Sequence, residues 1–276
     1  MTEMIAALAM YDWPEMRAET DAEWARLREA FRAAGLNAPE HLVRRNADMP
    51  SVPGGIMDAE GNVVAPDPAT LPSDELHLPT LWHHPALLFT QTCWGPMELW
   101  LAPHVRVVGQ PDYSAFVGGR GEFYSSAILM RAGGEADAAP SEDGTPSIPF
   151  DLIRGKRLGY NSDDSMSGII ALTRDLEAAG EGLDLFSELV ETGGHRLSIV
   201  AVAEGRADVC AVDCRSLALA RRFEPAVAGL RVVGWTGLRK GLPFIVPAGM
   251  PDETFAKLQS ALKASAQPAM SLASNG

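Results

Sequence analysis

The chain has 276 residues, of which 46% are hydrophobic and 21% charged, a composition typical of soluble globular proteins and long enough for two lobes. Its formal net charge of −13 at pH 7 excludes nucleic acid and anionic membrane surfaces as main partners. Apolar runs such as Pro85–Phe89 and Ile169–Leu172 are too short to cross a bilayer, so we expect no membrane insertion.

The N-terminal residues predict a strand followed by a helix. Met1–Met4 carries no basic segment and the apolar run Ile5–Met10 no cleavage pattern, so we interpret that run as a first strand and not as a signal peptide. On this pattern the protein is cytoplasmic, or a leader has been removed. Thr20 and Glu23 then have the spacing of a capping box, which predicts a helix that ends at Gly35.

Short apolar runs alternate with helical patterns along the rest of the chain, after a surface excursion over residues 46–75 that is rich in Pro, Gly and Asp. The expected strands are residues 86–90, 105–109, 122–131, 157–160, 187–191, 207–212, 230–235 and 244–246, and the expected longer helices are residues 165–179, 195–204, 213–223 and 251–264. This alternation predicts the α/β fold class, with parallel sheets and crossover helices.

The sequence indicates neither a metal nor a cofactor. Cys93, Cys210 and Cys214 form no C-x-x-C pattern, and we expect all three to be reduced and structural. His83 and His84 are adjacent and therefore point apart on regular structure, which disfavours a metal site. No nucleotide-binding loop and no serine–histidine–acid spacing is present, so no catalytic residue is predicted.

Residues 161–168, Asn-Ser-Asp-Asp-Ser-Met-Ser-Gly, lie between an expected strand and an apolar helix. The backbone N–H groups at such a helix start, together with the helix dipole, favour a bound anion. Ser165 and Ser167 can add hydroxyl donors to the same anion. The alternative is a plain helix cap, in which Ser165 satisfies the first turn.

A second turn of this kind, Glu-Thr-Gly-Gly-His over residues 191–195, places His195 at the next helix start. There the imidazole can donate to an oxyanion, or it can simply be a satisfied cap. Asp213 ends the following strand and either reaches the same cleft or caps the helix after it. Because the carboxyl ends of neighbouring parallel strands meet at one edge of a sheet, we expect these turns to face one crevice.

Several segments occur in an order and spacing that identify a family. They are residues 10–15 (Met-Tyr-Asp-Trp-Pro-Glu), 90–96 (Thr-Gln-Thr-Cys-Trp-Gly-Pro), 124–126 (Tyr-Ser-Ser), 155–160 (Gly-Lys-Arg-Leu-Gly-Tyr), 164–168, 192–195 and 205–213. Each segment is weak alone, but together they resemble the phosphate/phosphonate-type substrate-binding proteins of ABC transporters. The likeness covers roughly residues 4–265.

The resemblance implies a type II periplasmic-binding-protein fold, with two lobes that are each a mostly parallel sheet flanked by helices. Residues 1–122 and 236–276 are expected to form lobe 1 and residues 123–235 lobe 2, joined by hinge strands at 123–130 and 232–235. The lobes are expected to close on the ligand, because a ligand that contacts both lobes shifts the population toward the closed form.

The resemblance also implies a ligand site. Ser165, Met166 and Ser167 match the family's Ser-Thr-Ser turn, with Met166 replacing one hydroxyl, and His195 matches its anion-binding histidine. Arg215 stands where aminoalkylphosphonate binders have a carboxylate, which disfavours an aminoalkyl ligand. The expected ligand-binding residues are Tyr11, Thr92, Trp94, Tyr124, Ser165, Met166, Ser167, His195 and Asp213.

The function that follows is capture of a small phosphate- or phosphonate-like oxyanion, without catalysis. The implied partner is an ABC permease and the implied location the periplasm. Two alternatives stay open. One is a small-metabolite enzyme on the same fold, with His195 and Asp213 as an acid/base pair. The other is a cytoplasmic sensory binding module, which the missing signal-peptide pattern favours.

Overall fold

The structure, a computed structural model, describes residues 3–133 and 136–265. Within these residues the chain divides into two compact units. Unit 1 consists of residues 3–92, 97–110 and 242–265, and unit 2 of residues 93–96, 111–133 and 136–241. Residues 93–96 thus belong to unit 2, although the chain on both sides of them belongs to unit 1. The lobe boundaries expected from the sequence stay a prediction.

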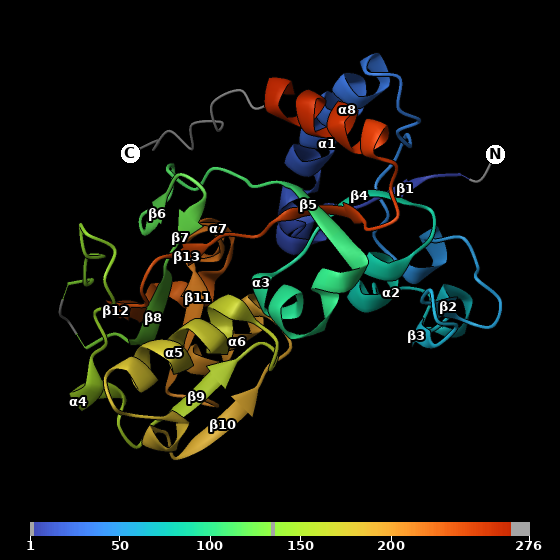
Figure 1. The fold of residues 1–276 in the computed structure, drawn as a ribbon. Helices are drawn as coiled ribbons and strands as arrows, with labels where there is room; N and C mark the ends of the chain where they lie inside the picture. Colours follow the sequence, from blue (N-terminus) through green and yellow to red (C-terminus); the bar gives the residue numbers. More distant parts are fainter. Residues whose placement is uncertain (1–2, 134–135, 266–276) are drawn as a thin grey trace. The chain divides into compact units, whose positions relative to one another are not determined.

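Unit 1 is built on a four-stranded sheet of described residues (Figure 1). Its strands, in spatial order, are β1 (Ile5–Ala6), β4 (Leu87–Gln91), β14 (Phe244–Pro247) and β5 (Val105–Gly109). β1 runs parallel to β4, whereas β14 runs antiparallel to both of its neighbours. All residues of β4 are buried, as expected of a strand in the middle of a sheet that is covered on both faces.

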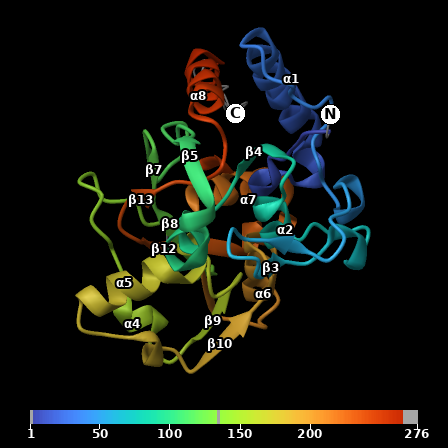
Figure 2. The same cartoon turned by 45° about the vertical axis from the view of Figure 1, so that its right-hand side comes forward.

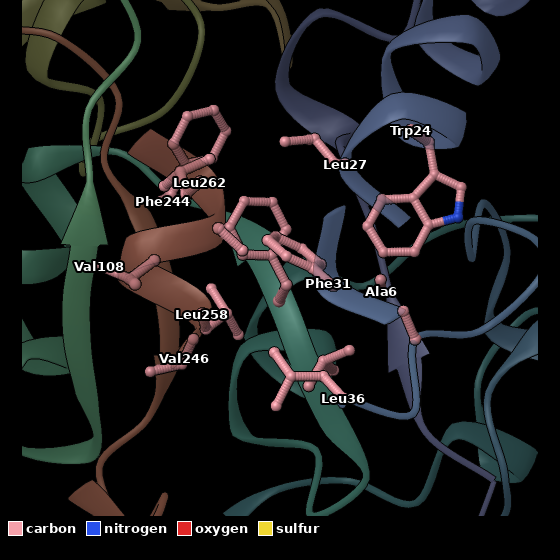
Figure 3. Packing of buried hydrophobic residues seen from close by; sticks show 14 of the residues in the cluster. Ala6, Trp24, Leu27, Phe31, Leu36, Val108, Phe244, Val246, Leu258 and Leu262 are labelled. Atoms are coloured by element: carbon pink, nitrogen blue, oxygen red, sulfur yellow. The ribbon is translucent and has the colours of Figure 1, made fainter. Parts of the chain in front are cut away.

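Helices α1 (Arg17–Ala33) and α8 (Asp252–Ser265) pack against each other, and their apolar side chains join those of the sheet in one core. The Phe89 ring lies at its centre, with ring centroids 5.2 Å from Phe31 and 5.0 Å from Phe244. Burial of each such side chain stabilises the fold by about 1.5–3 kcal/mol. Figure 3 labels Ala6, Trp24, Leu27, Phe31, Leu36, Val108, Phe244, Val246, Leu258 and Leu262 of this core.

The N-terminal segment departs from two of the predictions. Strand β1 ends at Ala6, and a 3₁₀ turn over Ala9–Tyr11 takes the place of the second half of the expected strand Ile5–Met10. The expected capping box at Thr20 is wrong, because α1 begins three residues earlier. A 3₁₀ turn that starts at Pro14 leads directly into α1, and proline, with its fixed φ and missing N–H, suits the first turn of a helix.

The excursion over residues 46–75 contains a small hairpin. Strands β2 (Ile56–Met57) and β3 (Val63–Ala65) pair antiparallel, and β3 contacts helix α2 (Leu78–His83) (Figure 2). None of the helices in the described part of the chain is long and apolar enough to cross a membrane.

Unit 2 is built on a five-stranded sheet, again counted over described residues. Its strands, in spatial order, are β10 (Glu188–Glu191), β9 (Arg157–Tyr160), β11 (Val209–Asp213), β8 (Ser126–Arg131) and β12 (Leu230–Trp235). β10, β9 and β11 are parallel, and β8 is antiparallel to both of its neighbours. Two further segments, β7 (Phe123–Tyr124) and β13 (Arg239–Lys240), pair in a separate small sheet with β6 (Gly119–Arg120). Both expected hinge strands thus contribute to sheets of unit 2.

Three helices of unit 2 follow its parallel strands, as the alternation predicted: α5 (Ala171–Ala178), α6 (His195–Ala203) and α7 (Cys214–Phe223). A short helix, α4 (Phe150–Ile153), lies earlier in the chain, between β8 and β9. The helix expected over residues 165–179 begins as a wide π-type turn, η7 (Met166–Ile170), and continues as α5. The turns before η7, α6 and α7 come directly after β9, β10 and β11, and these turns carry most of the candidate site.

Asp208, next to the start of β11, ties three segments of unit 2 together. Its carboxylate accepts hydrogen bonds from Arg157 Nε at 2.9 Å and from Arg131 Nη2 at 2.7 Å. The hydrogen bond from Arg157 contributes most to holding the pKa of Asp208 far below its usual range, against the opposing effect of partial burial.

Replacing Asp208 by asparagine should lower the free energy of unfolding by about 2 kcal/mol at pH 7, because charged hydrogen bonds are lost. Urea denaturation measures this loss in the free energy of unfolding. Asp252→Asn is the matched control: its carboxylate pairs with Arg106 but is 93% exposed, so its loss should stay below about 0.5 kcal/mol. The folded-state pKa of Asp208 lies below the unfolded value, so the difference between wild type and Asp208→Asn should shrink as the pH falls below about 4. A difference that stays constant down to pH 2 would contradict this assignment.

Candidate functional site

Three polar side chains meet where the parallel strands of unit 2 end. Ser167 comes from η7 after β9, His195 from the start of α6 after β10, and Asp213 from the end of β11. His195 Nε2 lies 2.8 Å from Ser167 Oγ and 3.5 Å from Asp213 Oδ2. The exposed fraction is 15% for the His195 side chain and 4% for that of Asp213. The structure therefore brings these three expected site residues together in a nearly buried cluster.

Asp213 caps α7, as one of the two alternatives for this residue predicted, and its Oδ2 also lies beside His195 Nε2. Its Oδ1 accepts the backbone N–H of Arg215 at 3.0 Å and that of Ser216 at 2.9 Å. Its Oδ2 accepts the Ser216 hydroxyl at 2.6 Å. The sequence reasoning missed Ser216, although its spacing of three residues from an Asp cap is a recognisable signal. These bonds fix the carboxylate in place beside His195.

Ser165 and Met166 use their polar groups within the protein. Ser165 Oγ accepts the Gly168 N–H at 3.0 Å, which is the helix-cap alternative for this hydroxyl. The Met166 N–H donates to Cys93 Sγ at 3.3 Å. A Cβ at Gly168 would overlap Asn161 Oδ1, so a larger residue here would displace the Asn161 side chain. The amide of Met166 is thus already satisfied by a thiol.

Cys93 is the second residue that sequence reasoning missed, since it was expected only as a buried structural thiol. Burial raises the pKa of Cys93 to about 11, so the thiol stays protonated at neutral pH and acts as a neutral acceptor. It belongs to unit 2 with Trp94, whose ring lies 5.6 Å from Lys240 Nζ. The position of Cys93 between two expected site residues, Thr92 and Trp94, was the available signal.

Tyr124 of β7 is 1% exposed, and its hydroxyl makes no hydrogen bond within the described residues. Burial is the main reason why the pKa of Tyr124 lies well above its usual value. Negative charge on Cys93 or Asp213 would raise it further, whereas the nearby Ser167 hydroxyl lowers it. Tyr124 therefore offers a neutral hydroxyl next to Ser167 in this cluster.

Tyr11 and Thr92 belong to unit 1. Tyr11 is 4% exposed. Thr92 follows β4, and its N–H donates to Pro243 O at 3.1 Å, while its buried hydroxyl has no hydrogen-bond partner within the described chain. Across residues 3–133 and 136–265, no group of three or more His, Cys, Asp or Glu side chains is arranged to hold a metal ion.

Comparison with known proteins gives one family and a set of solved structures. The family model described as "ABC transporter, phosphonate, periplasmic substrate-binding protein" matches residues 100–272. No curated protein matches the chain. A Prochlorococcus marinus protein solved with methylphosphonate is 14% identical with a TM-score of 0.60, over 95% of this chain and 83% of that one.

Two further solved structures have the same fold at low identity. A phosphonate-transporter binding component from Pseudomonas aeruginosa is 12% identical, with a TM-score of 0.57 over 93% of this chain and 72% of that one. A Xanthomonas citri protein solved with ATP is 11% identical, with a TM-score of 0.57 over 97% of this chain and 85% of that one. At these identities the structures establish the type II periplasmic-binding-protein fold. The family match covers more than half of the sequence, and the chain therefore belongs to the phosphonate family of ABC-transporter periplasmic substrate-binding proteins.

Proposed function

We propose that unit 2 holds a small tetrahedral oxyanion of the phosphonate class at the starts of η7 and α6. The observation that carries this proposal is the 2.8 Å approach of Ser167 Oγ to His195 Nε2, which joins two helix N-termini. The first amides of a helix have no partner inside the helix, and the dipole places positive charge there. The buried, unpaired Tyr124 hydroxyl supplies an independent reason to place a ligand atom here.

The ligand is held by hydrogen bonds more than by opposing charge. Ser167 and Tyr124 offer hydroxyl groups, α6 offers backbone amides, and the imidazole of His195 donates to a ligand oxygen. Hydrogen bonds to a charged group contribute about 1.5–3 kcal/mol each, so a few of them suffice for capture. Met166 is proposed to contribute little, because its amide already bonds to Cys93.

The arrangement of His195 supports binding over catalysis. In a serine–histidine–acid relay the nucleophile and the acid contact opposite nitrogens of the imidazole. Here Ser167 and Asp213 both face Nε2, and Nδ1 has no partner among the described residues. Burial also keeps Cys93 protonated, so its thiol is a poor nucleophile. We accordingly infer that the chain delivers its ligand unchanged to an ABC permease.

Titration calorimetry with methylphosphonate tests this proposal. Wild type should bind the ligand, and Ser167→Ala should weaken binding by roughly tenfold, as loss of one hydrogen bond to an anion predicts. Ser187→Ala is the matched control, because Ser187 is an exposed serine of the same unit and should leave the affinity unchanged. Equal affinities of wild type and Ser167→Ala would reject the site.

A further inference from the structure

The two ring nitrogens of His195 have different surroundings. Nε2 lies 2.8 Å from Ser167 Oγ and 3.5 Å from Asp213 Oδ2. Nδ1 is buried and finds no hydrogen-bond partner in the described chain. A buried polar atom that stays unpaired costs free energy and is uncommon in native proteins. Nδ1 therefore marks a position at which a ligand atom can satisfy the ring.

The Asp213 carboxylate beside Nε2 favours the neutral tautomer in which Nε2 carries the proton. A carboxylate only accepts hydrogen bonds, so the nitrogen that faces it is the one that bears hydrogen. Nδ1 of neutral His195 is then a bare lone pair. A lone pair cannot donate to an anionic oxygen and repels it. The neutral form of His195 is consequently unable to bond the ligand through Nδ1.

We propose that His195 takes up one proton when the oxyanion binds. The proton comes from solvent and adds to the Nδ1 lone pair, and no other bond forms or breaks. The resulting imidazolium keeps Nε2–H on the side of Ser167 and Asp213 and presents Nδ1–H to a ligand oxygen. This inference rests on the proposed function, because it assumes that the anion lies next to Nδ1.

The titratable groups around His195 agree with this assignment. Burial lowers the pKa of His195, while the Asp213 carboxylate raises it by a smaller amount. Tyr124 and Cys93 stay neutral, because burial raises the pKa of each. A bound anion adds negative charge beside the ring, which raises the pKa of His195 in the complex.

The cation next to His195 on α6 is already paired. Arg196 donates from Nε to Glu224 at 2.8 Å. The imidazolium is therefore the positive charge that the site itself gains on binding. Since binding raises the pKa of His195, the affinity should fall by about tenfold for each pH unit above the pKa of the unliganded ring, until the pKa of the complex is passed.

Titration calorimetry of the intact protein with methylphosphonate, in buffers of different ionisation enthalpy, counts the protons taken up. The measurement is made at a pH above the second ionisation of the ligand. Wild type should take up about one proton more than His195→Gln, which keeps a polar side chain at that position but cannot be protonated. The ligand's own proton exchange is common to both proteins and cancels in the difference.

Equal proton uptake by wild type and His195→Gln, with binding by both, would overturn this inference and leave the proposed function standing. If wild type binds no methylphosphonate, the proposed function fails and the inference fails with it. If His195→Gln binds too weakly to measure, the pH profile decides. Wild type and Ser167→Ala, which keeps the imidazole, should then lose affinity with the same slope of about tenfold per pH unit, and a flat profile would contradict proton uptake.

Discussion

A variant that lacks both Ser167 and His195 should lose roughly a hundredfold or more in affinity for methylphosphonate, about 3 kcal/mol. Each side chain is proposed to donate to the same anion, and Ser167 Oγ lies 2.8 Å from His195 Nε2. Groups that share a partner are energetically coupled by about 0.5–3 kcal/mol in a double-mutant cycle. Titration calorimetry on Ser167→Ala, His195→Ala and the double variant measures that coupling.

Thermal unfolding without ligand is the control for this cycle. Ser167 and His195 are expected to contribute less to stability than to binding, because the helix amides remain capped by other groups or by water. If instead both single variants lower the melting temperature and leave the affinity unchanged, the two residues are ordinary helix caps. That outcome is the alternative that the sequence left open for His195, and it would remove the proposed site.

Gly95→Ala should lower the free energy of unfolding by about 3 kcal/mol, the upper end of the usual cost of overpacking. A Cβ at this position would overlap the backbone carbonyl oxygen of Asp164 and would lie 3.0 Å from Ile170 Cδ1. A backbone oxygen cannot move aside as a side chain can. Asp164 directly precedes Ser165, so displacement of this contact should also weaken methylphosphonate binding.

Gly229→Ala provides the comparison within the same unit. No heavy atom lies within 4 Å of a Cβ built at Gly229, and its backbone is outside the left-handed region. Its effect on stability should stay within about 0.5 kcal/mol, the usual range for surface substitutions. Urea denaturation of both variants measures the difference. A stable Gly95→Ala protein with unchanged affinity would show that residues 93–96 do not support the turn over residues 164–168.

Much of unit 2 could be predicted from the sequence because its strands and helices alternate with clear periods. Strands β9, β10 and β12 begin and end within one residue of the predicted positions, and α6 and α7 begin within one. The turns at Ser167 and His195 were found for the same reason, since each follows a predicted strand and precedes a predicted helix. Local patterns are sufficient where the functional groups lie at element boundaries.

Contacts between residues distant in the sequence could not be predicted from local patterns. The Met166 N–H donates to Cys93 Sγ, 73 positions earlier in the chain, and no local periodicity predicts this contact. The antiparallel direction of β8 and β14 depends on pairing with strands distant in sequence. The shared use of His195 Nε2 by Ser167 and Asp213 is likewise a matter of side-chain geometry. These contacts determine which groups are free to bond a ligand. The candidate site could therefore not be predicted in full from the sequence alone.

The assignment of residues 93–96 to unit 2 has a consequence for protein engineering. A clone of residues 111–241 would carry Ser167, His195 and Asp213, yet it would lack the Cys93 thiol that the Met166 amide bonds. Exchange of residues 111–241 alone between relatives would therefore separate Met166 from the Cys93 thiol that its amide bonds. A chimaera must exchange the short 93–96 stretch together with the longer one, because the Met166 amide and the Cys93 thiol that it bonds lie in two separate stretches of the chain.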